Sequence, residues 1–245
     1  MLPYLSIGPA VVPVPALLLL AGVWVGTGLA EGAALRLGLN RETLANLILY
    51  SLIGGVLGAR LGHVLRHPAA YLADPLGVVA LTPSTLWVDA GLAAAVITGW
   101  VYGQRHALPL RRTLDALATG LAAFLVAVGL AHIASGDAFG APTDLPWAVT
   151  QWDARRHPAQ VYETGLAIGI LAIIWRRPLG DTAPGLNALL LVALTAAARL
   201  FLETFRGDSV LWVGGLRAAQ VVALAVLVAA LALMRAWAVA PKDAP

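Results

Sequence analysis

The amino-acid sequence predicts an all-α, polytopic membrane protein with about seven transmembrane helices. Three observations lead to this fold class: the 245 residues are 60% hydrophobic, only 12% are charged, and the apolar residues form long stretches. Charged residues supply about a quarter of an ordinary soluble domain, and a soluble chain with so little charge would fail to cover its surface. The composition therefore excludes a water-soluble globule, a disordered chain and a coiled coil.

The polar composition narrows the possible chemistry. The sequence contains no cysteine, so disulfides, thiolate zinc sites and a cysteine nucleophile are excluded. The net charge is only +3, an excess too small to indicate a nucleic-acid partner. All basic residues except Lys242 are arginines. Because a guanidinium holds a phosphate with two parallel N–H donors, this bias suits contacts with lipid head groups.

Seven apolar stretches are long enough to cross a bilayer, or nearly so. The predicted spans are 13–30, 44–65, 86–104, 114–134, 158–175, 184–203 and 217–238. The fifth reaches crossing length only if Pro158 opens it as a first-turn proline. The first span lacks a basic leader and contains Pro13 and Pro15, which argues against a cleaved signal peptide. No repeat or linker divides the chain, so we expect a single integral-membrane domain over 1–245.

The distribution of basic residues predicts the orientation, because cytoplasmic loops are enriched in arginine and lysine. With the N-terminus outside, the inner segments carry nine basic residues and the outer loops carry five. We therefore expect the N-terminus outside and the C-terminus in the cytoplasm. The two longest connections, roughly 66–85 and 135–157, then lie on the outer side, where ordered loops often carry function.

Ionisable side chains at membrane depth are costly unless paired or hydrated, so each is a candidate functional residue. In the expected orientation, five consecutive helices place such groups at their outer ends. The outer groups are Arg60, His63, Asp89, His132, Ser135, Asp137, His157, Glu163, Arg199, Glu203 and Arg206. The acidic residues near the inner ends, Glu31 and Asp115, are expected to be solvated. The one-sided clustering predicts a polar site in the outer half of the membrane.

Structural roles remain open for several of these residues. Arg199 and Glu203 are four residues apart, so they share a helix face and can form a purely structural ion pair. Arg206 can be an interfacial residue whose charged end reaches water. Asp137 can brace its loop as readily as take part in chemistry.

Arg60 and His132 stand out for different reasons. Arg60 lies among glycines spaced four apart, a pattern typical of close helix packing. Packing explains the glycines, whereas the arginine between them is expected to need an anion or a carboxylate. His132 is placed where a histidine can act as a base near neutral pH. The histidines do not form a metal-binding set, and no phosphate-binding glycine loop is present.

Two outer-loop segments and several helix ends carry specific motifs. These segments are Ile7-Gly8-Pro9, 58–65 followed by 71–76, 140–149, 156–163, 199–206 and a late Gln220. In order and in expected topology they resemble the bacterial prolipoprotein diacylglyceryl transferases over nearly the whole chain.

The resemblance implies an enzyme of the bacterial inner membrane that moves diacylglycerol from phosphatidylglycerol to the cysteine thiol of a lipoprotein precursor. Glycerol phosphate would be released, and neither a metal nor a cofactor is implied. The implied partners are a phospholipid and a prolipoprotein signal peptide. Clustered arginines fit this chemistry, because guanidinium groups stabilise a phosphate leaving group in a low-dielectric site. A base is also required, because the thiolate is the nucleophile.

The reactive centre departs from the family pattern. Where the family has His-Gly-Gly at the outer start of the third span, this chain has Asp89. The family signature Gly-Arg-x-Gly-Asn-Phe-x-Asn-x-Glu reads Val-Gly-Leu-Ala-His-Ile-Ala-Ser-Gly-Asp over 128–137. Gly129 thus replaces the arginine, His132 replaces an asparagine, and Asp137 replaces the glutamate.

These observations define two sets of candidate residues. The candidate catalytic residues are His132, Asp137, Asp89, Arg199 and Glu203. The candidate lipid-binding residues are Arg60, Arg206, His157, Tyr162 and Glu163. The alternative is an inactive homologue that serves as a structural or lipid-binding subunit of a larger membrane complex. A transporter is less favoured, because the polar groups concentrate on one side of the membrane.

Overall fold

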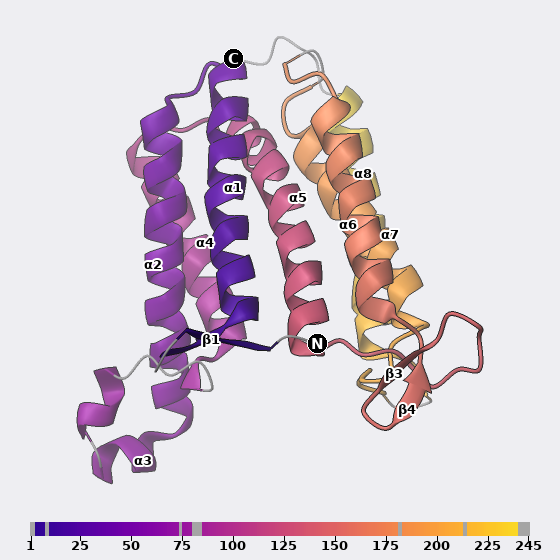
Figure 1. Ribbon diagram of the computed structural model, residues 1–245. Helices are drawn as coiled ribbons and strands as arrows, with labels where there is room; N and C mark the ends of the chain where they lie inside the picture. Colours follow the sequence, from indigo (N-terminus) through magenta and orange to yellow (C-terminus); the bar gives the residue numbers. More distant parts are fainter. Residues whose placement is uncertain are drawn as a thin grey trace. The chain divides into compact units, whose positions relative to one another are not determined.

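The computed structural model describes residues 3–7, 10–73, 75–79, 85–180, 183–212 and 215–239. Among these residues, seven helices have at least 18 residues, and each coincides with a predicted span (Figure 1). The long helices are α1 (Val14–Arg36), α2 (Arg41–Arg66), α4 (Val88–Arg105), α5 (Leu110–Ser135), α6 (Ala159–Arg176), α7 (Leu186–Glu203) and α8 (Ala218–Val239). The all-helical, polytopic fold class is confirmed. Gly8, Pro9, Asp74 and Lys242 lie outside the described residues.

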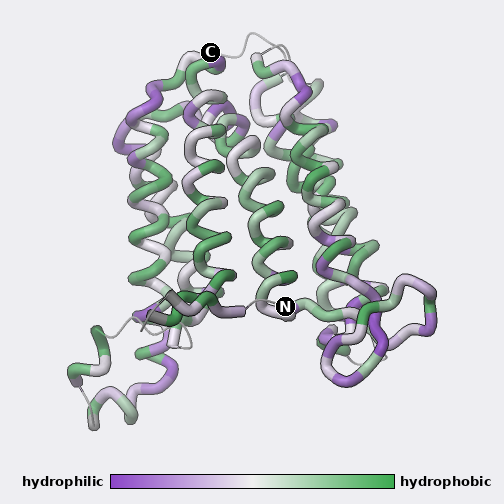
Figure 2. The backbone as a smooth tube through the Cα atoms, viewed as in Figure 1, coloured by the Kyte–Doolittle hydropathy of each residue, from purple (hydrophilic) through white to green (hydrophobic). Residues whose placement is uncertain are grey.

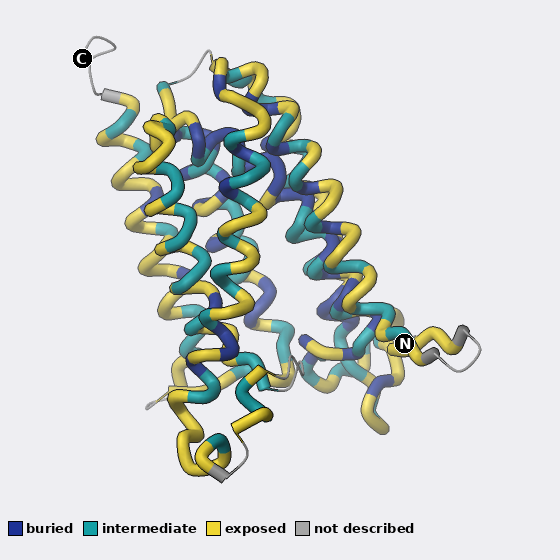
Figure 3. Tube along the Cα trace, turned by 90° about the vertical axis from the view of Figure 1, so that its left-hand side faces the viewer, coloured by how far each residue is buried: buried dark blue, intermediate teal, exposed yellow. Residues whose placement is uncertain are grey.

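The membrane character of these helices is visible in their surfaces. Five of them, α1, α2, α5, α7 and α8, are long and apolar enough to cross a bilayer. Most of the helical length is hydrophobic (Figure 2), and exposed residues continue along the helices (Figure 3). In α1, Leu20 is 66% exposed and Trp24 is 80% exposed, which suits contact with lipid rather than water. The count of seven spans and the external N-terminus stay predictions.

Short elements occupy the connections. β1 (Tyr4–Ile7) pairs antiparallel with β2 (Ala10–Pro13), immediately before α1. α3 (Pro68–Ala73) and the 3₁₀ turn η1 (Pro75–Val79) follow α2, whereas β3 (Val149–Gln151) and β4 (Ala154–Arg156) form a hairpin before α6. Pro158 is the residue before the first helical residue of α6, so it precedes the first turn instead of opening it as expected.

The chain divides into two compact units, one made of 38–110 and the other of the remaining segments on either side. The prediction of a single domain stays a prediction. In the smaller unit, α2 and α4 pack through small residues: the backbone of Gly58 lies against Ala94, and that of Gly62 lies against Ala90. The interpretation of these glycines as packing residues is confirmed.

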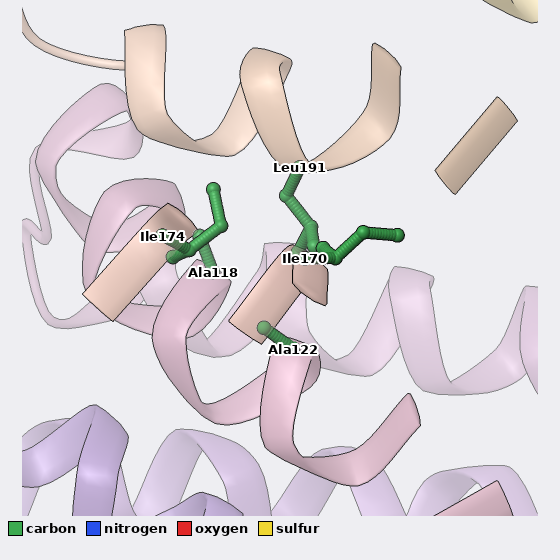
Figure 4. Packing of buried hydrophobic residues seen from close by; sticks show 5 residues of the cluster. All are labelled: Ala118, Ala122, Ile170, Ile174 and Leu191. Carbon is green, nitrogen blue, oxygen red and sulfur yellow. The ribbon is translucent and has the colours of Figure 1, made fainter. Parts of the chain in front are cut away.

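In the larger unit, α1 crosses α5 where Gly26 meets Gly120. A Cβ on Gly26 would lie 2.8 Å from the Gly120 carbonyl oxygen, so both helices need glycine there. On its other side α5 packs against α6 and α7 (Figure 4). The buried contact is formed by Ala118, Ala122, Ile170, Ile174 and Leu191.

Asp115 is buried, at 3% exposure, and the expectation that it is solvated was wrong. Its Oδ2 accepts a hydrogen bond from Gly185 N at 2.6 Å, and its Oδ1 accepts one from Ala188 N at 2.9 Å. The first N–H groups of a helix have no partner within that helix, so the Asp115 carboxylate caps α7. This cap fixes the start of α5 beside the start of α7.

Removal of this cap is expected to destabilise the larger unit. In Asp115→Ala, two buried N–H groups lose their acceptors, which costs about 2–4 kcal/mol in free energy of unfolding. The apparent melting temperature of the detergent-solubilised protein should therefore fall by at least about 5 °C. Asp144→Ala, which changes an exposed aspartate, is the matched control. An equal melting temperature for both variants would refute the capping role.

Candidate functional site

An apolar groove of about 600 Å³ lies between α5, α7 and α8. Leu121 and Leu125 of α5, Thr195 of α7 and Val222 of α8 line it, and Arg199 is the single charged residue among the described lining residues. Arg199 lies near the last turn of α7, beside the start of α8. The groove is thus hydrophobic along its length and cationic at one end, and its volume is in the range of ligand sites.

Glu203, one turn beyond Arg199, is almost fully buried at 1% exposure. Arg199 Nε lies 3.3 Å from Glu203 Oε2, so the ion pair expected from their spacing is confirmed. This oxygen accepts no hydrogen bond from the described residues. The contact with Arg199 is therefore an ion pair without a hydrogen bond. The Arg199 side chain is 39% exposed, which leaves its terminal nitrogens open to an anion at the end of the groove.

Arg206 also lies near Glu203, with its Nε 4.0 Å from Oε2, but a second carboxylate holds it more closely. Its Nε lies 2.8 Å from Asp208 Oδ1 and its Nη2 lies 2.6 Å from Asp208 Oδ2, a two-point ion pair. The side chain is 13% exposed, so this pairing, rather than contact with water, accounts for its position. Its predicted contact with phosphate would require Asp208 to move aside. Arg199 is therefore the better placed of the two arginines.

The end of α7 has a further support that sequence reasoning missed. Arg217 Nη1 donates hydrogen bonds to the carbonyl oxygens of Glu203 and Arg206, the latter at 3.0 Å, and to Ser209 Oγ at 2.8 Å. The last carbonyls of a helix have no partner within that helix, so an arginine satisfies them well. The sequence carries little signal for this role, because Arg217 lies 14 residues after Glu203 and directly before α8.

His132 and Glu163 form a pair between two helices. His132 Nδ1, in the last turn of α5, lies 2.7 Å from Glu163 Oε2, in the second turn of α6. The histidine side chain is 30% exposed and the glutamate side chain 19%. The sequence predicted both as site residues, His132 as a catalytic residue and Glu163 as a lipid-binding residue.

Gly129, at the position of the family arginine, lies in a tight contact between α5 and α6. A Cβ there would lie 2.5 Å from Thr164 Oγ1 and 3.0 Å from Thr164 Cα. Thr164 Oγ1 is itself fixed, because it donates a hydrogen bond to the Gln160 carbonyl oxygen at 2.7 Å. The space that an arginine would need at this position is therefore occupied by α6.

His157 and Tyr162 belong to an aromatic cluster that joins the start of α6 to the end of α7. The ring of Phe205 lies edge-on to both, with centroid separations of 5.1 Å to His157 and 5.6 Å to Tyr162. The Tyr162 hydroxyl accepts a hydrogen bond from Trp147 Nε1 at 2.7 Å. His157 Nδ1 is buried and has no hydrogen-bond partner among the described residues. The lipid-binding role of these two residues stays a prediction.

Asp137 follows α5 in a loop held by buried amides. Its carboxylate is exposed, and its backbone nitrogen donates to Ser135 Oγ at 3.1 Å. Gln160 Nε2 donates to the Asp137 carbonyl oxygen at 3.0 Å, and Gln151 Nε2 donates to Gly136 O at 2.8 Å. Both glutamines are buried and were missed by sequence reasoning, which weighed only ionisable side chains.

Arg60, in the smaller unit, is 5% exposed, and its guanidinium donates to backbone carbonyls. Its Nε donates to Val78 O at 2.8 Å, its Nη1 to Thr85 O at 3.1 Å and its Nη2 to Gly77 O. Its guanidinium carbon also lies 5.1 Å from the centre of the Tyr71 ring. The expectation that this arginine needs an anion or a carboxylate was wrong, because three backbone carbonyls satisfy it.

Asp89 lies in the first turn of α4, in the same unit. It is exposed, and its Oδ2 accepts a hydrogen bond from Trp87 Nε1 at 3.1 Å. No ion pair links it to an arginine among the residues that the structure describes. The salt bridge that would have tied up a phosphate-binding arginine is therefore not formed there.

The fold and the site define a multi-pass helical membrane protein with an apolar groove that ends at an arginine. The sequence profile of the prolipoprotein diacylglyceryl transferases matches residues 3–236. The chain belongs to this family, and it is a multi-pass protein of the bacterial plasma membrane.

Curated relatives support this assignment. A phosphatidylglycerol–prolipoprotein diacylglyceryl transferase of Gloeobacter violaceus is 30% identical over 226 residues, which cover 86% of this chain and 83% of the relative. The same enzyme from Ruegeria pomeroyi is 32% identical over 181 residues, 66% of this chain and 61% of the relative. The enzyme from Aromatoleum aromaticum is 36% identical over 146 residues, which cover 57% of this chain and 55% of the relative. Two of these three matches thus span less than two thirds of the relative.

Proposed function

We propose that this chain transfers the diacylglyceryl group of phosphatidylglycerol to the cysteine thiol of a lipoprotein precursor. The observation that carries the proposal is the apolar groove between α5, α7 and α8, with Arg199 at its end. Such a groove suits an acyl chain along its length and a phosphate at its cationic end. The three relatives described above carry the name of this enzyme.

The chemistry needs charge stabilisation at the phosphate. When the thiolate sulfur attacks the terminal glycerol carbon of the diacylglyceryl group, the C–O bond to the phosphate breaks and its electron pair stays on the phosphate oxygen. Glycerol phosphate therefore leaves with one additional negative charge. Arg199 is placed to stabilise this charge, and the buried Glu203 carboxylate fixes its Nε side. Because Arg60 is occupied by carbonyls and Arg206 by Asp208, Arg199 takes the main phosphate role in this proposal.

Complementation with a blocked groove tests the proposal. In a bacterium depleted of its own transferase, the unaltered chain and Val228→Trp are expected to restore lipoprotein modification, whereas Val222→Trp is not. Val222 lines the groove, so an indole there excludes an acyl chain. Val228 lies on the same helix and does not line the groove. The two side chains are similarly exposed, Val228 at 59% and Val222 at 53%.

Two results would contradict this proposal. Failure of the unaltered chain to restore modification, at a normal membrane level, would favour the inactive homologue. Equal restoration by both tryptophan variants would show that the groove does not hold the lipid.

A further inference from the structure

The contact between His132 and Glu163 fixes which ring nitrogen carries the proton. An ionised carboxylate only accepts hydrogen bonds, so the Nδ1–H of His132 donates to Glu163 Oε2 across the 2.7 Å contact. In the neutral ring, Nε2 then keeps its lone pair and is a proton acceptor. Because the His132 side chain is 30% exposed, a substrate group has access to this ring. The family signature carries asparagine here, which is not a base.

His132 lies on nearly the same face of α5 as two residues that line the groove. His132 follows Leu125 by seven residues and Leu121 by eleven, so all three lie on nearly the same face of α5. The Asp115 cap holds the second turn of α5 beside the start of α7, and a bridge between Gly140 and Arg206 joins the segments after the two helices, so α5 and α7 run in the same direction. At 1.5 Å per residue, His132 lies about 25 Å along α5 from Asp115, and Arg199 lies about 20 Å along α7 from its first residue. The two side chains are thus at a similar depth.

His132 has one ionisable contact among the described residues, and further charged groups lie at the same end of the larger unit. Glu163, on α6, is the ionisable group that contacts it. The same end of the unit also holds Asp137, whose carboxylate is exposed in the loop after α5, and a set of charged residues on and after α7, namely Arg199, Glu203, Arg206, Asp208 and Arg217. The Glu163 carboxylate lies where it would stabilise the imidazolium that forms when His132 accepts a proton during the reaction.

We infer that His132, oriented by Glu163, is the general base of the reaction, an inference that rests on the proposed function. Nε2 takes the proton from the cysteine thiol of the precursor and becomes part of an imidazolium. The thiolate forms the S–C bond, the C–O bond to the phosphate breaks, and glycerol phosphate leaves with that electron pair. The imidazolium then gives its proton to the departing phosphate or to water. Glu163 is a positioning residue that stabilises the imidazolium without touching the substrate.

A pH series with a cysteine-containing signal peptide and phosphatidylglycerol tests this inference. At pH 7, His132→Gln is expected to slow transfer by about 100-fold, with little change in the KM for the lipid. The deficit should shrink as the pH passes about 8.5, because the thiol then ionises without a base. Glu163→Gln is expected to lower kcat by less than His132→Gln does, with little change in the KM for the lipid, since the imidazolium formed in the reaction loses its anionic partner.

Controls separate a catalytic from a structural role. His106→Gln changes a histidine that contacts the Tyr102 carbonyl at the end of α4, and it should keep the wild-type rate. His132→Asn, which restores the family residue, serves as a second variant if the glutamine variant does not fold. Wild-type activity of either His132 variant at pH 7, or a deficit that is constant with pH, would overturn the base assignment. Absence of transfer by the wild-type protein would overturn the proposed function, and the base with it.

Discussion

Arg199→Gln is expected to slow diacylglyceryl transfer by about 100- to 1000-fold, the typical effect of removing one donor from a developing negative charge. The guanidinium lies at the end of an apolar groove, and a neutral glutamine there cannot stabilise the charge on the phosphate. The neighbouring arginine that could replace Arg199 at the phosphate is occupied, since Arg206 is paired with Asp208. The loss should appear in kcat as well as in kcat/KM, because the charge on the leaving phosphate increases in the transition state.

The matched control is Arg176→Gln, which removes an exposed arginine in the last turn of α6. Transfer of diacylglycerol to a signal peptide, followed in detergent or in vesicles, should be unchanged in this variant. The transfer rate of Arg199→Lys should lie between the rates of Arg199→Gln and Arg176→Gln, since lysine keeps the charge but loses the two-point geometry. A normal rate for Arg199→Gln would place the phosphate elsewhere and contradict the site described above.

Gly129→Arg, which restores the family signature, is expected to destabilise the protein rather than to increase its activity. The first side-chain carbon would already lie 3.0 Å from Thr164 Cα, so α5 and α6 would have to separate. Overpacking of this kind costs about 1–3 kcal/mol, and a charge placed in the contact adds to the cost. The apparent melting temperature in detergent should fall, and the rate of transfer should not exceed that of the wild type.

A pair of alanine variants isolates the packing effect. Gly129→Ala introduces only the Cβ and is expected to lower the melting temperature, whereas Gly165→Ala, in open space on α6, is not. If Gly129→Arg were fully stable and faster than the wild type, the close contact between α5 and α6 at Thr164 would be wrong. The missing arginine would then be a true catalytic deficit.

The sequence was informative about the helices because a bilayer imposes a simple rule on each segment alone. The stretch 44–65 lies inside α2, and 217–238 differs from α8 by one residue at each end. The end of α1 was less predictable. The helix continues to Arg36, six residues past the expected end, because residues 31–36 include good helix formers such as Ala33, Ala34 and Leu35.

The site was predictable residue by residue, but its pairs were only partly predictable. Arg199 and Glu203 are neighbours on one helix, so their spacing alone predicted their contact. His132 and Glu163 lie on different helices, 31 residues apart, and only the packing of α5 against α6 brings them together. Arg60 shows the converse limit, since its partners are backbone carbonyls, which carry no sequence signature.

The most direct test of the account is a product count with purified protein in phosphatidylglycerol vesicles and a signal peptide that contains one cysteine. The predicted result is one glycerol phosphate released for each thioether formed, with both products lost in Arg199→Gln. Binding of phosphatidylglycerol without thioether formation would contradict the proposed activity and identify an inactive, lipid-binding member of the family.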